Sequence, residues 1–574
     1  MTICNIVKRF FSGHRGVLFL ILCMCGLCVV ESMPPVPKKK AKTRKKTTVS
    51  RAKPRPSDKR IYLVHADELR YDQFQNNNAQ ILIGNVHFDH MGARLFCDSA
   101  NFYEDSNSFE AYGHVKMYQG DTLSLFSDYA FYDGNDELAR ARYNVVLKHR
   151  KSTLYTDSLD YDRMYNLGYF FEGGKLIDNG SVLTSDWGEY HTDTKMAFFA
   201  YDVELKDNDF FLTTDSLYYN TQSSVAHIVG PSRIISGTSN IYSEDGYYNT
   251  KTDHSELFGR SVVKDKGRSL VGDSVYYNST TGSSFAYRNV EFSDSVNKNM
   301  LTGDFLEYNE ATGYAMATKN AVAVDFSQKD TLFMHADTFK VFTYHINTDS
   351  VYRVMHAYHK VRAYRVDLQA VCDSLVYDQK DSVMTMYRDP IVWNGNQQLL
   401  GEVIQAYMKD SVIDRAHVLG QALSVELMFD SVHYNQLTSK EMLAFFRNGQ
   451  ISEAHAKTNA LAIYHVIDDA DSAFIAQDYT ESPLMKMFFE NRKMKRIWVE
   501  KPKGVMYPMT QIPADKKFLP NFVWFDYIRP LNKQDIFNWR GKKKEQELIP
   551  EKRREAPVQN LKKPEALKPP ENHE

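Results

Sequence analysis

The chain has 574 residues, of which 43% are hydrophobic and 25% charged, a balance typical of a folded protein and long enough for several domains or one repeat array. The formal net charge of −2 argues against a protein that binds nucleic acid as a whole. Aromatic residues make up 13% of the chain, with 36 Tyr and 34 Phe, and they favour β-strands.

Residues 1–32 are predicted to be a signal peptide. Lys8, Arg9 and Arg15 supply positive charge before an apolar run of 14 residues at 17–30. A membrane-spanning helix needs about 20 apolar residues, whereas a shorter run fits the apolar region of a secretory signal. We therefore expect export, with an uncleaved membrane anchor as the alternative.

Residues 33–60 are predicted to be a basic, disordered linker. Lys and Arg fill 12 of the 23 positions from 38 to 60, so this segment cannot bury enough apolar surface to fold. A contact with the phosphates of anionic lipids is the alternative interpretation. At the other end of the chain, residues 541–574 form a second charged segment that is also expected to be disordered.

A repeat fills the region between these two segments. Motifs such as HADELRYD (65–72), CDSANFYE (97–104) and TDSLYYN (214–220) share an acidic residue followed by alternating apolar positions. The acid recurs at steps of 29 to 36 residues, at Asp67, Asp98, Asp128, Asp157, Asp186, Asp215, Glu244, Asp273, Asp304, Asp337 and Asp373. A period of this size indicates one stacked array, predicted over 61–482, rather than separate globular domains.

The pattern inside each repeat predicts an all-β fold. Positions two and four after the acid are apolar or aromatic and those between are mixed, as in a strand with one buried face. A Val-rich segment such as GNVHF (84–88) or YNVVLKH (143–149) follows and is predicted to be a second strand. We expect an elongated, repetitive β-jellyroll or solenoid-like stack of about 29-residue units whose two sheets close over one long core.

The repeated acid is expected to have a structural role. Asp at the start of a strand accepts backbone N–H groups in a turn, and the preceding residue is small in nearly every copy, as at Cys97, Ser127 and Thr156. These features indicate a tight corner. Whether the small residue or the acid points inward stays open, because a bulge reverses the alternation.

No residue is predicted to be catalytic, and no metal or cofactor site is predicted. The sequence contains no nucleophile motif, phosphate-binding loop or metal-ligand spacing. Four of the six cysteines lie in the signal segment, and the remaining two, Cys97 and Cys372, are too few for a disulfide framework or a structural zinc site. Carboxylates are abundant, so a carbohydrate-active β-helix enzyme stays an alternative, which a surface cleft with two carboxylates about 5–9 Å apart would support.

The repeat resembles the OstA-like repeats of LptA and of the periplasmic N-terminal domain of LptD. The likeness is carried by the segment 66–72 followed by Gly84-Asn85-Val86, and by Tyr112-Gly113-His114-Val115, and it extends over 61–480 in a long form similar to the OstA-like proteins of Bacteroidetes. The resemblance implies a β-jellyroll with a hydrophobic groove in the lipopolysaccharide transport bridge between the inner and outer membranes. It also implies a periplasmic location, binding of the acyl chains of lipid A, and contacts through edge strands with other Lpt-type β-jellyroll proteins.

On this resemblance, the buried stripe of the repeat is expected to line a groove for acyl chains. The candidate lipid-binding residues are Leu69, Tyr71, Phe102, Tyr132, Leu159, Tyr161, Leu217, Tyr219, Tyr277 and Tyr308. A structural or adhesive solenoid with a closed core requires the same stripe and is the alternative. An empty interior groove would argue against that alternative.

Residues 483–540 depart from the repeat. They contain Met485, Phe488, Trp498 and Trp524 among several prolines. A terminal cap that seals the array is expected, and a docking surface for a membrane partner is the alternative.

Overall fold

A computed structural model describes residues 60–543, apart from 72–78, 207–210, 469–472 and gaps of one or two residues in other turns. The predicted signal peptide, the linker up to residue 59 and the tail from residue 544 lie outside the described residues. The described residues form two compact units that divide between Ala357 and Tyr358, within strand β25 (Tyr352–Arg365).

The first unit consists of strands joined by short turns. They are β1 (Tyr62–His65), β2 (Glu68–Tyr71), β3 (Gln80–His90), β4 (Ala93–Tyr103), β5 (Ser108–Gln119), β6 (Leu123–Asp133), β7 (Leu138–His149), β8 (Ser152–Asp162), β9 (Leu167–Phe170), β10 (Gly174–Asp178), β11 (Ser181–Ser185), β12 (Trp187–His191), β13 (Met196–Lys206), β14 (Phe211–Asn220), β15 (Val225–Ser236), β16 (Ser239–Asn249), β17 (His254–Asp265), β18 (Arg268–Asn278), β19 (Ser283–Asp294), β20 (Asn299–Asn309), β21 (Tyr314–Thr318), β22 (Val322–Asp325), β23 (Leu332–His335) and β24 (Thr338–Tyr344).

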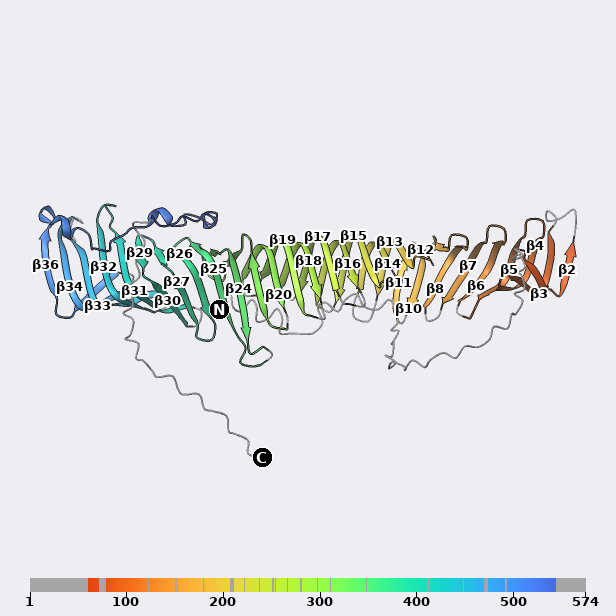
Figure 1. Ribbon diagram of the computed structural model, residues 1–574, viewed down its shortest axis with the longest axis horizontal. Helices are drawn as coiled ribbons and strands as arrows, with labels where there is room; N and C mark the ends of the chain where they lie inside the picture. The colour runs from red at the N-terminus through yellow and green to blue at the C-terminus, as the bar shows by residue number, and fades with distance from the viewer. Residues whose placement is uncertain are drawn as a thin grey trace, which may run out of the picture. The chain divides into compact units, whose positions relative to one another are not determined.

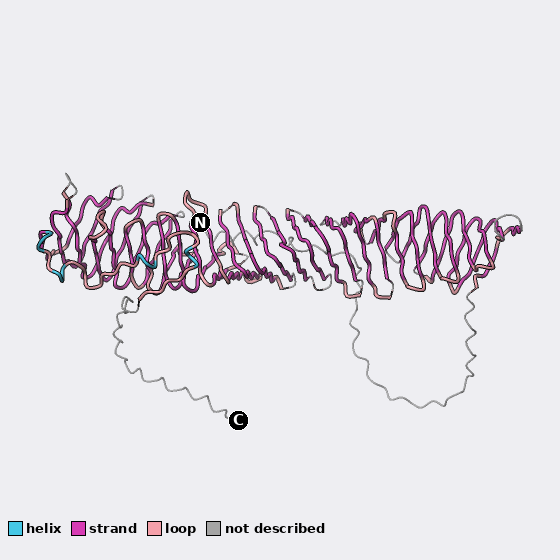
Figure 2. The backbone as a smooth tube through the Cα atoms, turned by 90° about the horizontal axis from the view of Figure 1, so that it is seen from above, coloured by secondary structure: helices cyan, strands magenta, loops and turns pink. Residues whose placement is uncertain are grey.

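Full-length strands pair antiparallel with the next strand along the chain, so most of the unit is a meander (Figures 1 and 2). Where a strand is split at its bend, its two pieces pair with the flanking strands and not with each other, as β11 and β12 both pair with β13. The prediction of an all-β fold is confirmed, and no α-helix occurs among the described residues. The repeat differs from the expectation in one respect. The Val-rich segment lies in a strand after that of the acid's stripe, as expected, but it does not begin that strand, because 84–88 belongs to the second half of β3 and 143–149 to that of β7.

The long strands bend near their middle, where every second one carries a β-bulge. In β3, Gly84 and Asn85 both have positive φ and together face one residue of β4, so the register shifts between Ile83 and Val86. The same shift recurs between Tyr112 and Val115 in β5 and in the later long strands. A bulge kinks the strand and strengthens its twist. Stacked bulges therefore form a corner row that divides every strand into two halves.

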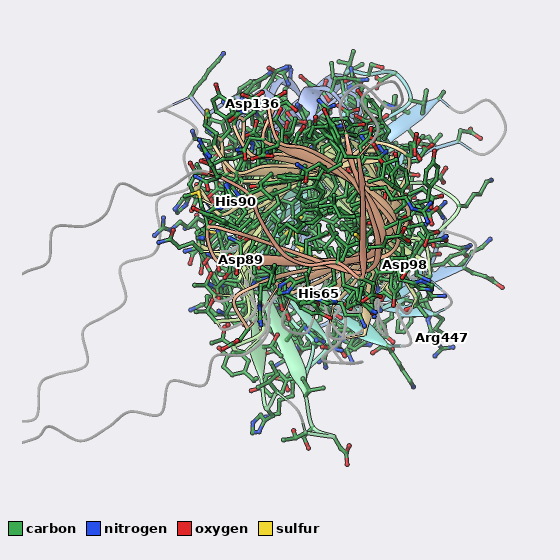
Figure 3. The ribbon with its side chains drawn as sticks, turned by 90° about the vertical axis from the view of Figure 1, so that its right-hand side faces the viewer. His65, Asp89, His90, Asp98, Asp136 and Arg447 are labelled. Atoms are coloured by element: carbon green, nitrogen blue, oxygen red, sulfur yellow. The ribbon has the colours of Figure 1, made fainter. Side chains whose placement is uncertain are left out.

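The two halves of the strands face each other across an apolar interior. Phe88, in the second half of β3, stacks on Phe109 of β5 with ring centroids 4.4 Å apart and lies 5.6 Å from Phe102 of β4. All three side chains are buried. Figure 3 looks at the β2 end and shows His90 and Asp98 on opposite sides of the array. Asp98 marks the corner row, and His90 marks the mouth, defined as the side on which the hairpin ends of the two halves meet.

The second unit repeats this architecture with longer strands. They are β26 (Leu368–Asp378), β27 (Val383–Tyr387), β28 (Ile391–Asn394), β29 (Gln397–Leu400), β30 (Val403–Lys409), β31 (Val412–Leu427), β32 (Tyr434–Arg447), β33 (Gln450–Ile467), β34 (Phe474–Glu490), β35 (Lys493–Val499) and β36 (Lys503–Pro508). The bulge recurs here, with a register shift between Leu419 and Ala422 of β31.

The described residues after β36 form no strand. Residues 509–543, called the C-terminal strap, contain four short 3₁₀ turns, η2 (Met509–Gln511), η3 (Ala514–Lys516), η4 (Asp526–Ile528) and η5 (Asp535–Phe537). The strap runs back along the second unit, from β34 past β32 and β29 to β26 and β25, as the dark blue segment in Figure 1 shows.

The predicted boundary of a terminal cap at residue 483 therefore falls inside β34, and residues 483–508 continue the strand array. The strap lies lengthwise on the unit instead of covering its last strand. Within the described residues, no helix is long and apolar enough to cross a membrane.

Candidate functional site

The interior of the first unit is the candidate site, and most of the predicted lining residues lie in it. Those that are buried are Phe102, Tyr132, Leu159, Leu217, Tyr219 and Tyr308. Tyr161 and Tyr277 are partly buried, and Tyr161 packs against the cluster around Phe88. The alternation holds closely in β14, where Tyr219 is 4% exposed and its neighbour Tyr218 is turned outward and stacks on Phe198.

Leu69 and Tyr71 lie outside this interior. They are 52% and 58% exposed on β2, which pairs with β3 alone among the described strands. Their motif matches the buried copies, but no further described strand covers them at this end of the unit. The position in the stack, and not the motif, decides their burial.

A narrow cavity lies between the two halves of the strands near the β3 end. Its lining includes Phe88 and Leu95 from one half and Phe109 and Tyr132 from the other, and its volume is about 30 Å³. One water molecule needs roughly 10–15 Å³ by this measure, so the cavity has room for about two waters and not for an acyl chain. The groove is closed at this end of the unit.

Side chains also close the mouth beside this cavity. The Nδ1 atom of His90, at the end of β3, lies 2.7 Å from the hydroxyl of Tyr132 on β6, and both residues are buried. Burial raises the pKa of Tyr132 to about 12, so its hydroxyl keeps its proton at neutral pH. This contact joins the two halves of the array across the mouth.

The small residue before each repeated acid points inward. In the five copies where this residue is Ser or Thr, its hydroxyl donates to the carbonyl two residues later, over distances of 2.7 to 3.2 Å: Ser127 to Tyr129, Thr156 to Ser158, Ser185 to Trp187, Thr214 to Ser216 and Ser243 to Asp245. A bulge interrupts the ladder of backbone hydrogen bonds. The hydroxyls therefore satisfy carbonyls at the corner that would otherwise be buried without a donor.

The acid itself points outward and binds a side chain of the neighbouring strand. The pairs, separated by 2.6 to 3.0 Å, are Asp67 with Asn85, Asp98 with His114, Asp128 with Asn144, Asp273 with Asn289 and Asp304 with Asn320. Four of the five pairs are 16 residues apart in sequence. This spacing is the signal in the sequence that could have identified the corner.

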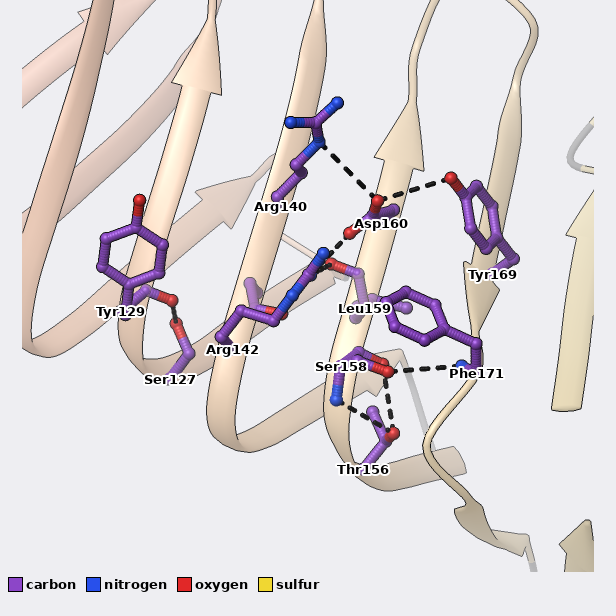
Figure 4. A network of polar contacts seen from close by, with 11 residues as sticks. Ser127, Tyr129, Arg140, Arg142, Thr156, Ser158, Leu159, Asp160, Tyr169 and Phe171 are labelled. Atoms are coloured by element: carbon purple, nitrogen blue, oxygen red, sulfur yellow. Dashed lines mark hydrogen bonds and ion pairs between the residues drawn. The ribbon is translucent and has the colours of Figure 1, made fainter. Parts of the chain in front are cut away.

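A buried carboxylate organises the outer side of β7–β9 (Figure 4). Asp160 accepts a hydrogen bond of 2.5 Å from Arg142 and one of 3.3 Å from the hydroxyl of Tyr169, and Arg140 lies 3.7 Å away. The guanidinium of Arg142 also lies over the ring of Phe171. These contacts neutralise the carboxylate and tie three strands together, so the cluster has a structural role.

Comparison with known families matches the N-terminal part of this array. Residues 58–215 and 201–262 match the family model described as OstA-like protein. Residues 58–262 are called the OstA-like region after this match. The corner geometry of the OstA-like region continues beyond residue 262, because the Asp273–Asn289 and Asp304–Asn320 pairs reproduce it.

No curated protein matches the chain. Among solved structures, one similar chain is the crystal structure of LptH, the LptA homologous periplasmic component of the conserved lipopolysaccharide transport device from Pseudomonas aeruginosa. The two are 17% identical over 17% of this chain and 76% of that chain, with a TM-score of 0.16. No metal-binding group of His, Cys, Asp and Glu residues occurs in the described part of the chain.

Proposed function

We propose that the protein is a periplasmic lipopolysaccharide-binding and transport protein, which holds acyl chains in its apolar interior between the inner and outer membranes and catalyses no reaction. The observation that carries this proposal is the apolar interior, which continues from strand to strand between the two halves of the OstA-like region. Phe170, Leu212, Leu217, Ile228 and Ile241 belong to one such cluster, which spans β9 to β19.

The energetics explain why such an interior suits a lipid. Exposing a CH₂ group to water costs about 0.8 kcal/mol, so a 14-carbon acyl chain carries on the order of 10 kcal/mol of unfavourable hydration. A stack of similar repeats offers neighbouring sites of similar affinity, which lets a chain slide without a deep trap. Entry requires the two halves to separate, because the present cavity is too small. The contact between His90 and Tyr132 is one that would have to break.

Photo-crosslinking in living cells tests the proposal. A photoreactive amino acid replaces Tyr219, which is buried, and in a matched variant replaces Tyr218, the outward neighbour on the same strand. We expect a lipopolysaccharide adduct at Tyr219 and none at Tyr218. The absence of an adduct at Tyr219, Tyr161 and Tyr277 would overturn the proposal.

That negative result would favour the second candidate function, a structural β-array with a closed core. The observation on its side is the small size of the cavity between Phe88 and Tyr132. Both candidates require the same buried stripe, so the adduct at Tyr219 decides between them.

We further propose that the end strands of the array pair with other Lpt-type jellyroll proteins. Among the described strands, β36 pairs only with β34, and β2 only with β3. Both ends expose apolar side chains, which are Tyr62, Val64, Leu69 and Tyr71 at one end and Ile497, Trp498, Val505 and Met506 at the other. Residues 493–508 carry five Lys or Arg and one Glu.

An edge of this kind can add a strand from a partner. A photoreactive residue at Val505 is expected to give a protein adduct in cells, whereas one at Val432, exposed in a turn of the same unit, gives none. Equal yields at the two positions would contradict pairing through the end strand.

A further inference from the structure

The C-terminal strap fills the mouth of the second unit with apolar side chains. Leu519, Phe525 and Ile528 are at most 5% exposed, and they share one buried cluster with Trp393 of β28 and Ile463 of β33. Phe525 is fully buried. The strap thus occupies the apolar interior of this unit.

Side-chain amides of the strands hold the backbone of the strap. Gln398 of β29 is fully buried, and its amide nitrogen donates to the carbonyl of Val523 at 2.9 Å while its amide oxygen accepts from the N–H of Phe525 at 2.8 Å. Gln436 of β32 accepts from the N–H of Leu519 at 2.8 Å.

Two further glutamines extend this series. Gln477 of β34 donates to the carbonyl of Lys516 at 2.7 Å. Gln369 of β26 accepts from the guanidinium of Arg529 at 2.7 Å. Four strands therefore bind the strap at successive points along its length, through side chains.

Three of the four glutamines, Gln369, Gln398 and Gln436, lie in one inward row across the sheet. The pairing of strands places Gln369 opposite Trp393, Trp393 opposite Gln398, and Gln398 opposite Val425, which is itself opposite Gln436. The strap follows this row and so runs across the strands, along the stacking direction. In the proposed function an acyl chain would take the same path over the same apolar side chains.

The strap is not part of the sheet. No described residue of 509–543 is in a strand, and its short turns are closed by local backbone hydrogen bonds such as that from the N–H of Ile528 to the carbonyl of Phe525. A segment held by side chains can leave without breaking the ladder between strands. Its removal would expose the apolar surface of Trp393, Leu423 and Ile463.

We propose that the C-terminal strap is a displaceable occupant of the second unit, which competes with acyl chains for the interior lined by Trp393, Leu423 and Ile463. This inference rests on the proposed function. It assigns a second acyl-chain site, covered by the chain itself, in a part of the protein that lies beyond the OstA-like region.

Photo-crosslinking of the purified full-length protein with lipid A tests the competition. The photoreactive residue replaces Tyr434, which packs under the strap with ring centroids 5.1 Å from Phe522 and 5.6 Å from Trp524. Phe525→Ala is combined with it to weaken the strap, and Leu531→Ala is the matched control, because Leu531 belongs to the strap but is 67% exposed.

Phe525→Ala is expected to raise the yield of lipid adduct at Tyr434 by about tenfold or more, since truncation of a buried Phe weakens strap binding. Leu531→Ala should leave it unchanged. No rise with Phe525→Ala, while Tyr219 in the first unit still forms an adduct, would overturn the strap proposal alone. No adduct at Tyr219 either would overturn the proposed function.

Hydrogen exchange of the unmodified protein gives a second test that needs no destabilised variant. The N–H groups of Leu519 and Phe525 are bonded to Gln436 and Gln398, so displacement of the strap exposes them. Addition of lipid A should speed exchange of peptides covering 517–528 and not those of β33. Unchanged or slower exchange in the strap would contradict displacement.

Discussion

Loss of a single corner hydroxyl should loosen the array locally, and Ser243→Ala is the sharpest case. Ser243 is 1% exposed, and its Oγ lies 2.7 Å from the carbonyl oxygen of Asp245, 2.9 Å from that of Phe258 and 2.9 Å from the Oγ of Ser261. Ser261 also donates to the carbonyl of Phe258, so alanine leaves chiefly the Asp245 carbonyl without its donor. An unsatisfied buried group costs about 1–3 kcal/mol. We therefore expect the free energy of local opening of β15–β17 to fall by about 1–3 kcal/mol in Ser243→Ala.

Hydrogen exchange followed by mass spectrometry measures this effect, because a stacked array does not unfold as one two-state unit. A change of 1–3 kcal/mol corresponds to exchange about 5–150-fold faster in peptides that cover 228–263. The control is Ser223→Ala, at an exposed turn residue, which should change exchange by less than about twofold. A change in Ser243→Ala no larger than in the control would refute the role of the hydroxyl at the corner.

Three further perturbations test other contacts. Gly113→Ala should destabilise β4–β6, since Gly113 has φ +69° and a Cβ there would lie 2.5 Å from a carboxylate oxygen of Asp98. In a urea titration of the full chain, the first unfolding transition should have its midpoint at a lower urea concentration. Burial and the nearby His433 lower the pKa of His465 to about 4, so the unfolded chain binds the extra proton between pH 6.5 and 4. The free energy of unfolding should therefore fall by on the order of 3 kcal/mol as the pH is lowered through that window. Thermal unfolding measured at a series of pH values should show a smaller fall for His465→Gln. Asp160→Asn should lower the free energy of local opening of β7–β9 by about 1–3 kcal/mol. Hydrogen exchange of peptides covering 138–171 should become faster, and unchanged exchange there would contradict the role assigned to this carboxylate.

The period-two pattern predicts the strands and their buried face because the side-chain alternation is a property of the backbone. Leu217 and Tyr219 face inward and Tyr218 faces outward, as the positions after Asp215 predict. Burial itself depends on neighbours as well. Leu69 and Tyr71 satisfy the same pattern and are exposed, because they sit on the end strand.

The bend of each strand was not predictable from the alternation. A run such as Gly113-His114-Val115 was interpreted as the start of a new strand, yet both Gly113 and His114 have positive φ and turn a continuing strand through the corner. Positive φ costs little for Gly but more for other residues. The bond from His114 to Asp98 across the strands helps to offset that cost, and this pairing joins residues that the sequence alone does not link.

The strap was predictable only as a departure from the repeat, since its contacts join residues far apart in sequence, such as Gln398 and Phe525. Those contacts also predict how the two interiors should differ. An acyl chain offers no hydrogen bond, so lipid that replaces the strap leaves the buried amide nitrogen of Gln398 without the carbonyl of Val523, while the amide oxygen keeps the hydrogen bond from Nε1 of Trp393. The unpaired nitrogen costs about 1–3 kcal/mol where water does not reach it. The interior around Tyr219 carries no such penalty from a displaced segment. With the strap sequence unchanged, lipid A at limiting concentration should therefore form an adduct with a photoreactive residue at position 219 at lower concentrations than with one at position 434. Equal adduct yields at the two positions would show that the row of buried amides does not lower the affinity for lipid.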